Sequence, residues 1–209
     1  MPTTRVGVVA DTHCPEFMGQ LPDTVLRALQ GVRLIIHAGD VDGQSTLDTL
    51  AEIAPVEAVR GDHDRALGSL PRIRELTVEG RRIVVVHGDR SRWAEEPQTL
   101  LWTLSLGRYR PHKRLPLLLR RMFPDADVIV YGHTHRPEMW HLAGGPLVFN
   151  PGAVFQWTPA TARQRLAARP GWFEWSWLQF ARHMRLGARP SVGILELRDG
   201  DIRPKIVPV

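Results

Sequence analysis

The sequence has few cysteines and few lysines. Cys14 is its only cysteine, and lysine occurs only at Lys113 and Lys205. A single thiol cannot form an internal disulfide, so the fold must depend on packing or on bound metal, as is usual in a reducing compartment.

Long apolar runs are also absent. The longest stretch without a charged residue, 139–162, is interrupted by three prolines and a Gly-Gly pair, which excludes a transmembrane helix there. The first apolar run, 6–10, is too short for a secretory signal and is followed by Asp11. The sequence therefore predicts a cytoplasmic protein.

Length and composition indicate one folded domain over residues 1–209. The chain has 209 residues, of which 43% are hydrophobic and 23% charged. These values exclude the disordered, collagen-like and repeat classes. The net charge of +5 is unevenly spread, since residues 89–189 carry 15 basic and 7 acidic side chains.

The pattern of apolar residues predicts an α/β fold. Short β-branched runs at 6–10, 34–37, 56–60 and 83–87 enclose helical spacing at 22–30 and 44–54, which is a βαβαβ order. Further strands are expected at 128–131, 139–142 and 147–149. A closing hairpin over 192–198 and 202–207 would turn at Asp199-Gly200.

Two basic, tryptophan-rich stretches, 90–123 and 154–190, interrupt this order and are predicted to be helical insertions. The first has an apolar stripe at i, i+3, i+4 and i+7, and the second a similar stripe that leaves Trp172 and Trp175 on another side of the helix. The stripe residues are Leu115, Leu118, Leu119 and Met122, and then Phe173, Trp177, Phe180, Ala181 and Met184.

Histidines and aspartates follow five of the predicted strands. In chain order the groups are Asp11-Thr12-His13, Gly39-Asp40, Gly61-Asp62-His63-Asp64, His87-Gly88-Asp89 and Gly132-His133-Thr134-His135. Loops at the carboxyl ends of neighbouring strands in a doubly wound sheet converge, so these groups are expected to meet. Mixed imidazole and carboxylate ligands suit Mn, Fe, Zn or Ni, and a set of this size predicts a two-metal centre.

A histidine at the end of one strand is often only a hydrogen-bonded loop residue, and the prediction depends on the whole set. Outside the set, His37 is expected to be a hydrogen-bonded core residue and Cys14 a small buried thiol. His112, His141 and His183 receive no site role. Asp42 and Asp89 are expected to be solvated or to support ligands.

The motifs D-x-H, G-D, G-D-H-D, H-G-D and G-H-T-H, in this order, resemble the calcineurin-like metallophosphoesterase superfamily, in particular its small prokaryotic single-domain phosphodiesterases. The similarity extends over about residues 1–90, 125–155 and 191–209 and includes Asn150-Pro151-Gly152-Ala153. It implies a β-sandwich flanked by helices, with the metal loops at one edge.

The resemblance also implies roles for the site residues. One metal would take Asp11, His13, Asp40 and His135, and the second Asp40, Asp62, His87 and His133. Asp40 would bridge the two divalent ions, Mn²⁺ above all, with Ni, Fe or Zn as alternatives, and a hydroxide held between the ions would attack phosphorus. His63 would donate a hydrogen bond or proton to the phosphate or leaving group, and Asp64 would orient the His63 ring.

The sequence departs from the family pattern at Asp62, where most members have asparagine. The extra negative charge makes the expected two-metal centre formally neutral, which should favour monoanionic diesters over phosphate dianions.

Three function classes follow. The first is a metal-dependent phosphoesterase, in particular a phosphodiesterase. The second is a non-enzymatic scaffold, because a retromer subunit shares this fold. The third is a nuclease of the same superfamily, disfavoured because no nucleic-acid motif is present.

The insertions leave their own alternatives open. They could pack together as a cap that selects substrate, or present Trp172, Trp175 and arginines to anionic lipid and serve a lipid-linked pyrophosphate. A third alternative is nucleic acid, because arginine and tryptophan also suit phosphate contacts and base stacking. Oligomeric state is not predicted.

Overall fold

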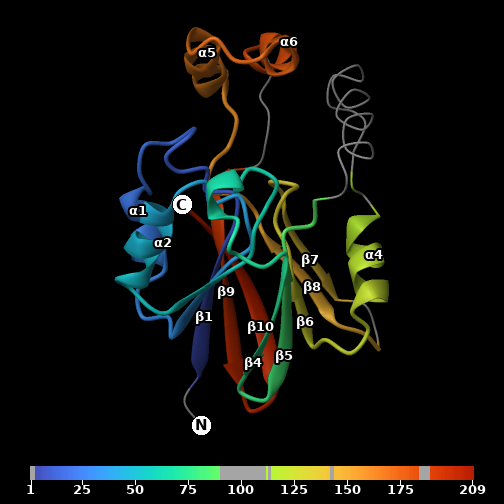
Figure 1. Ribbon diagram of the computed structural model, residues 1–209. Helices are drawn as coiled ribbons and strands as arrows, with labels where there is room; N and C mark the ends of the chain where they lie inside the picture. Colours follow the sequence, from blue (N-terminus) through green and yellow to red (C-terminus); the bar gives the residue numbers. More distant parts are fainter. Residues whose placement is uncertain (1–2, 90–111, 113, 142–143, 184–188) are drawn as a thin grey trace.

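The computed structural model describes residues 3–89, 112, 114–141, 144–183 and 189–209. Two five-stranded sheets pack face to face, with helices on their outer faces (Figure 1). The elements are β1 (Thr4–Val9), α1 (Asp23–Ala28), β2 (Leu34–His37), α2 (Gln44–Ala51), β3 (Val56–Ala58), the 3-10 turn η1 (Arg65–Leu67), β4 (Ile73–Val78), β5 (Arg81–Val86), α4 (Leu115–Met122), β6 (Val128–Val130), β7 (Pro137–His141), β8 (Leu147–Pro151), α5 (Pro159–Ala167), α6 (Trp172–Ala181), β9 (Ser191–Arg198) and β10 (Asp201–Pro208).

Each sheet contains two parallel and two antiparallel strand pairs. The first sheet has the order β10-β9-β1-β2-β3, in which β1, β2 and β3 are parallel. The second has the order β4-β5-β6-β8-β7, in which β5, β6 and β8 are parallel. The predicted fold class, a helix-flanked β-sandwich of mixed α/β type, is confirmed, although the five histidine and aspartate loops come from two sheets rather than one.

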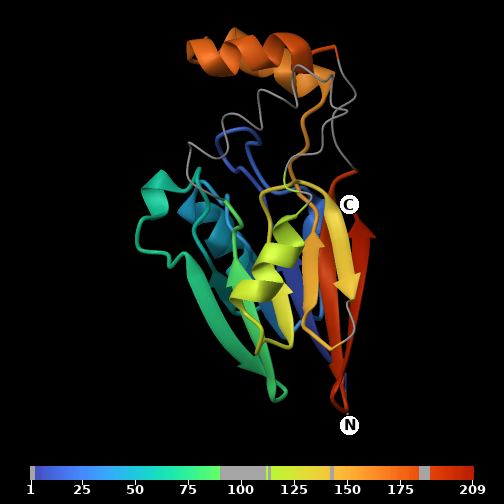
Figure 2. The ribbon, with the colours of Figure 1, turned by 90° about the vertical axis from the view of Figure 1, so that its right-hand side faces the viewer.

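Successive side chains of each strand point to opposite faces of its sheet, so the core has one layer between the sheets and further layers beneath the helices. Val8 and Ile36 face the second sheet and pack in the same cluster as Val85 and Phe149. Their neighbours point outward, where Val9 and Ile35 pack beneath α1 and α2, and Val84, Val86 and Ile129 pack beneath α4 (Figure 2). Because both faces are covered, the strands read as continuous apolar runs.

Two elements differ from the sequence prediction. The strand β4 was not predicted, because charged side chains interrupt its apolar positions and Ile73 is 47% exposed at the sheet edge. In α4, Leu115 and Leu119 are buried as expected, but Leu118 and Met122 are exposed, so the predicted four-residue stripe is wrong there.

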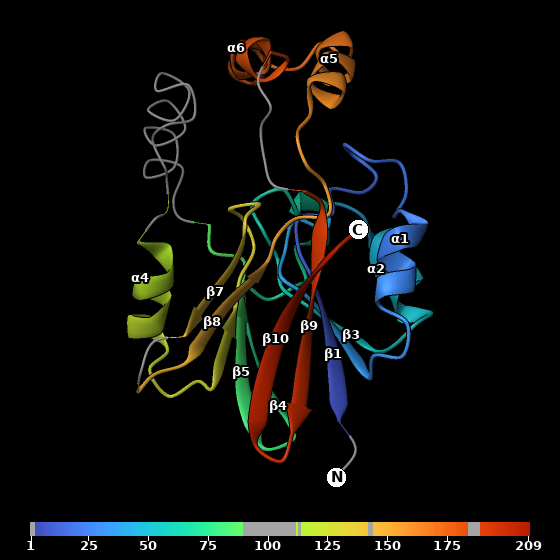
Figure 3. The ribbon, with the colours of Figure 1, turned by 180° about the vertical axis from the view of Figure 1, so that it is seen from behind.

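The second insertion contains α5 and α6, which lie together beyond one end of the sandwich (Figures 1 and 3). Among the described side chains of α6, Leu178 and Ala181 are fully buried, and Trp172 and Trp175 are exposed on another side, as predicted. The side chains of Phe173 and Phe180, which belong to the predicted stripe, lie outside the described ones. Met184 and residues 90–111 and 113 lie outside the described residues. Among the described helices, none combines the length and apolar composition needed to span a membrane.

The predicted closing hairpin is present as β9 and β10. It turns at Asp199 and Gly200, both of which have positive φ, as a type I′ turn requires. This end of the sandwich lies opposite the end at which the histidine and aspartate loops meet (Figure 3).

Candidate metal centre

The five predicted loops converge at one edge of the sandwich. Their side chains form overlapping triplets in which the possible ligand atoms lie within 4.8 Å of one another. The triplets are Asp11-His13-His135, Asp62-His87-His133, Asp11-Asp40-His87, Asp40-Asp62-His63 and His13-Asp42-His63. The first four contain all seven predicted metal ligands and His63.

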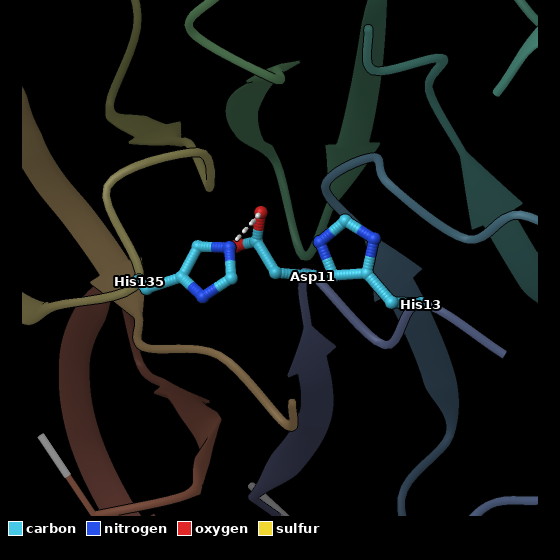
Figure 4. Close-up of side chains that lie close together, drawn as sticks. All are labelled: Asp11, His13 and His135. Carbon is cyan, nitrogen blue, oxygen red and sulfur yellow. Dashed lines mark ion pairs between the residues drawn. The ribbon is translucent and has the colours of Figure 1, made fainter. Parts of the chain in front are cut away.

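The first triplet joins both sheets. Asp11 and His13 follow β1 in the first sheet, and His135 follows β6 in the second (Figure 4). The imidazole Nε2 of His135 lies 3.6 Å from Asp11 Oδ1. Asp11 is fully buried, and burial raises its pKa to about 6. A bound cation would offset the cost of ionising this carboxylate.

The second triplet lies beside the first. His87 Nε2 is 3.3 Å from Asp62 Oδ1, and His133 Nδ1 is 3.8 Å from the same oxygen. Asp62 is half exposed, whereas the His87 side chain has no exposed surface. This triplet therefore has one open side, toward solvent.

Asp40 lies between the two triplets. Its Oδ2 is 3.6 Å from His13 Nε2 and 3.3 Å from His87 Nε2. Burial alone would raise the pKa of Asp40, but the imidazoles of His87 and His13 hold it well below its usual range. Asp40 therefore presents an ionised carboxylate to histidines of both triplets.

Hydrogen bonds at the outer ring nitrogens orient two of the imidazoles. His87 Nδ1 lies 2.8 Å from the Ala38 carbonyl oxygen, so this nitrogen carries the proton and donates it. His13 Nδ1 faces Asp42 Oδ2 at 3.3 Å. In both residues the remaining Nε2 points toward Asp40, which is the usual arrangement of metal-bound histidine.

The surroundings of His87 Nε2 favour positive charge. This atom is buried and has no hydrogen-bond partner among the residues that the structure describes. Burial opposes protonation of His87, yet the carboxylates of Asp40 and Asp62 raise its pKa well above the usual value. A divalent cation would satisfy the orphaned nitrogen and the carboxylates together, so the residues present fit a bound metal.

The loop backbone is strained where the candidate ligands occur. Five of them, Asp11, His13, Asp40, His133 and His135, have φ between 49° and 65°. Such left-handed conformations cost roughly 1 kcal/mol or more in residues other than glycine and cluster at functional sites.

Two glycines of the motifs are needed for close approach. A side chain at Gly61 would overlap the Asp40 carboxylate, and one at Gly39 would overlap the His87 ring. Gly39 also has a φ of 91°, which disfavours any other residue. These contacts explain why glycine precedes an aspartate in both motifs.

The resemblance implied that Asp64 orients the His63 ring, but the structure shows no hydrogen bond or ion pair between these two described residues. The two carboxylate oxygens of Asp64 instead accept backbone N–H bonds from Gly61 and from Asp40, Val41 and Asp42, at 2.7–2.9 Å. Asp64 therefore ties the loop after β3 to the loop after β2 and holds the backbone of Asp40.

His63 is exposed at the rim of the centre. Its backbone N–H donates to Asp40 Oδ1 at 3.0 Å, and its ring lies 4.9 Å from that of His13, centroid to centroid. Its imidazole is thus next to both candidate ligands and open to a bound substrate.

Residues outside the predicted set also shape the site. Asn150 donates to the Gly132 carbonyl at 2.8 Å and Gln156 to the His135 carbonyl at 2.9 Å, which fixes the histidine loop after β6. The His112 ring lies 4.9 Å from that of His133, although His112 was given no site role. Phe17 packs beside His13 at 5.1 Å. Only Asn150 carried a sequence signal, as part of the N-P-G-A motif.

Cys14 and His37, which were not predicted as ligands, are both buried in the structure. Cys14 is buried, and burial raises its pKa to about 11, which describes an unreactive thiol. His37 is buried and neutral, because burial lowers its pKa to about 4. Its Nε2 lies 3.1 Å from Thr12 Oγ1, but its Nδ1 has no partner in the described part of the chain, so only one ring nitrogen is satisfied.

Comparisons with known proteins agree with this geometry. A family model for the calcineurin-like phosphoesterase superfamily domain matches residues 4–168. A probable metallophosphoesterase of Methanothermobacter thermautotrophicus is 34% identical over 149 residues, which are 71% of this chain and 76% of the relative. A probable metallophosphoesterase of Methanocaldococcus jannaschii is 35% identical over 135 residues, 65% of this chain and 60% of the relative.

A solved structure of Vacuolar Protein Sorting 29 from Cryptosporidium parvum has the same fold. It superimposes with a TM-score of 0.61 over 99% of this chain and 98% of that one, at 19% sequence identity. At that identity the likeness concerns the fold alone.

Proposed function

This chain belongs to the calcineurin-like phosphoesterase superfamily, and from this membership we propose that it is a metal-dependent phosphoesterase that acts on phosphodiesters. The observation that carries the proposal is the gathering of seven candidate ligand side chains from two sheets, among them His87, whose buried Nε2 makes no hydrogen bond within the described residues and faces the carboxylates of Asp40 and Asp62. The archaeal relatives named as probable metallophosphoesterases support the same class.

The residues divide into two metal positions. Asp11, His13 and His135 would hold one ion, Asp62, His87 and His133 the other, and Asp40 would contact both. When bound, two divalent cations lower the pKa of water between them and neutralise charge on the phosphoryl oxygens. His63, at the open rim, is placed to donate a hydrogen bond or proton to the departing ester oxygen.

The test is hydrolysis of bis-p-nitrophenyl phosphate by metal-stripped protein with and without Mn²⁺. Addition of Mn²⁺ is expected to restore turnover in the native protein but not in His133→Ala, because this variant lacks a ligand of the second metal. Asp48→Asn, an exposed substitution on α2, serves as the matched control and should behave like the native protein.

A scaffold without activity is the competing hypothesis, favoured by the fold shared with a vacuolar sorting protein. Absence of turnover with Mn²⁺, Ni²⁺, Fe²⁺ and Zn²⁺ would support the scaffold and contradict the phosphoesterase.

The diester preference is argued from Asp62. Its carboxylate adds a negative charge beside His87 and His133, where most family members have a neutral amide. Asp62→Asn should therefore raise monoester hydrolysis relative to diester hydrolysis, by about tenfold if the lost charge acts at short range. The measurement is the ratio of kcat/KM for p-nitrophenyl phosphate and its bis ester, and an unchanged ratio would remove this argument.

A lipid phosphate ester is a second candidate substrate, favoured by the exposed tryptophans of α6. Trp172 is 82% exposed and Trp175 is 51% exposed. Co-sedimentation with phosphatidylglycerol vesicles, lost in a Trp172→Ala, Trp175→Ala variant, would support this candidate. Equal sedimentation of both proteins would count against it.

A further inference from the structure

An aromatic wall lies beside the candidate metal centre. We use this name for Phe17, Phe155 and Trp157, whose ring centroids are 5.0–5.4 Å apart. The ring of Phe17 lies 5.1 Å from that of His13 and 5.8 Å from that of His63. Phe155 is buried, whereas Phe17 and Trp157 are only half-buried and keep exposed surface next to the rim.

The second insertion holds this wall in place. The Arg165 guanidinium of α5 lies over the Phe17 ring at 4.9 Å. It also pairs with Glu174 of α6 at 2.7 Å and with Glu16, the neighbour of Phe17, at 3.0 Å. Trp157 packs against Trp177 of α6 at 5.1 Å. The first metal loop and the α5–α6 pair are thus joined through aromatic and ionic contacts.

The position of His63 indicates which part of a substrate would contact the aromatic wall. If His63 protonates the departing oxygen, the group attached to that oxygen lies beside the His63 ring. The described aromatic rings next to His63 are those of His13 and Phe17. His13 Nε2 is directed to Asp40, so the surface that remains for the departing group is the Phe17 ring.

We propose that the aromatic wall binds a flat, apolar group on the departing side of the phosphate ester, and that Phe17 determines this specificity. The inference rests on the proposed phosphoesterase function. A second phosphate or a carboxylate suits the wall less well, because Arg165, the cation that lies over Phe17, already pairs with two carboxylates. A flat ring would instead stack or pack edge-on against Phe17 and Trp157.

The test uses two ligands that are not hydrolysed, phenylphosphonate and methylphosphonate, titrated into the Mn²⁺-loaded full chain by calorimetry. The native protein is expected to bind phenylphosphonate about tenfold more tightly. Phe17→Ala should reduce this preference below about twofold without changing the Kd of methylphosphonate, and Phe17→Tyr should retain it. Phe123→Ala removes a half-buried ring at the end of α4 and should leave both affinities unchanged.

The outcomes separate the two proposals. Failure of both phosphonates to bind, together with absence of bis-p-nitrophenyl phosphate hydrolysis by the Mn²⁺-loaded native protein, would overturn the phosphoesterase centre itself. Equal binding of the two phosphonates by the native protein, or an undiminished preference in Phe17→Ala, would overturn only the aromatic wall. If Phe17→Ala does not fold, Phe17→Leu keeps the apolar bulk, loses the flat ring and is expected to lose most of the preference.

Discussion

The metal-free centre concentrates buried charge and backbone strain in a few residues. Asp11 has no exposed surface, and its backbone is in the left-handed conformation. The same conformation occurs at His13 in the same loop and at Asp40 in the loop after β2. Burial disfavours the ionised form of Asp11, although both of its carboxylate oxygens accept the His133 N–H at 3.1 Å. Such an arrangement lowers the stability of the metal-free protein and favours cation binding.

Asp11→Asn should therefore stabilise the metal-free protein at neutral pH. The unfolded carboxyl ionises near pH 3.8 and the folded one near pH 6, so ionisation costs the native state increasing stability as pH rises between these values. Two pKa units correspond to about 3 kcal/mol at most, or roughly 5–10 °C in Tm. Asparagine tolerates the φ of 51° at this position.

The measurement is calorimetry of metal-stripped native and variant proteins from pH 4 to pH 8. The Tm difference should open between pH 4 and pH 6 and then stay constant. Mn²⁺ should raise the Tm of the native protein more than that of Asp11→Asn, because the variant keeps the second group of candidate ligands, Asp62, His87 and His133, but loses a carboxylate from the first. A variant less stable than the native protein at pH 7 would contradict the cost assigned to Asp11.

The sequence predicted the candidate ligand residues, which the structure brings close together, but not the residues that hold their loops. Histidine or aspartate beside glycine at a strand end is a local signal, and all seven predicted ligands lie within the converging loops. The partners of Asp64 depend on how the loops after β2 and β3 align, which no local pattern specifies. Phe17 and Trp157 lie far apart in the sequence and meet only through the tertiary fold.

At the scale of elements, the loops of the centre are fixed by hydrogen bonds to side chains rather than by regular structure. Asp64, which precedes η1, accepts four backbone N–H groups, three of them from the loop after β2. Asn150, at the end of β8, similarly holds the loop after β6. Each support comes from a different element than the ligands it positions.

Asp64→Asn should loosen the bridging aspartate. Each Asp64 oxygen accepts two N–H groups, and an amide offers only one acceptor oxygen, so two of the four donors would lose their partner and face an NH₂ group. We expect a loss of about 2–4 kcal/mol, or roughly 4–12 °C in Tm, and about 10- to 100-fold weaker Mn²⁺ binding.

Scanning calorimetry and a Mn²⁺ titration measure the two effects of Asp64→Asn. Asp48→Asn is the matched control, because Asp48 is exposed and bonds only Gln44 among the contacts described. Native Mn²⁺ affinity in Asp64→Asn would show that the backbone of Asp40 is held by other contacts.

Elements were predicted where one strong pattern was present. Strands buried on both faces, such as β5 and β6, appear in the sequence as apolar runs. The edge strand β4 has one half-buried and one exposed face with charged residues on both, so its signal was weak. In α4, Leu118 and Met122 continue the helical stripe in the sequence, but they are exposed and do not join the cluster that Leu115 and Leu119 form with the sheet.

At the scale of the whole molecule, the candidate centre joins the two sheets at one end. The loops of the first sheet supply Asp11, His13, Asp40 and Asp62, and those of the second supply His87, His133 and His135. At the opposite end the sheets are joined without metal, by the Thr4 hydroxyl donating to Glu79 at 2.7 Å and by Arg81 donating to the Gly200 carbonyl. Bound cations would therefore add a second connection between the sheets, at the end opposite these hydrogen bonds.

Metal removal should then loosen one end of the sandwich selectively. The N–H groups of His133 and Phe155 donate across the metal end to the side chain and carbonyl of Asp11. Hydrogen exchange at these two amides should be about 10- to 100-fold faster without Mn²⁺, since local opening there no longer has to break metal ligation. The amide of Arg82, which donates to Asp127 near the opposite end, should exchange at an unchanged rate under conditions where global unfolding is rare. Equally faster exchange at both ends would mean that the metal stabilises the molecule only as a whole. Unchanged exchange at both ends would mean that protein contacts alone hold the sheets together at this edge.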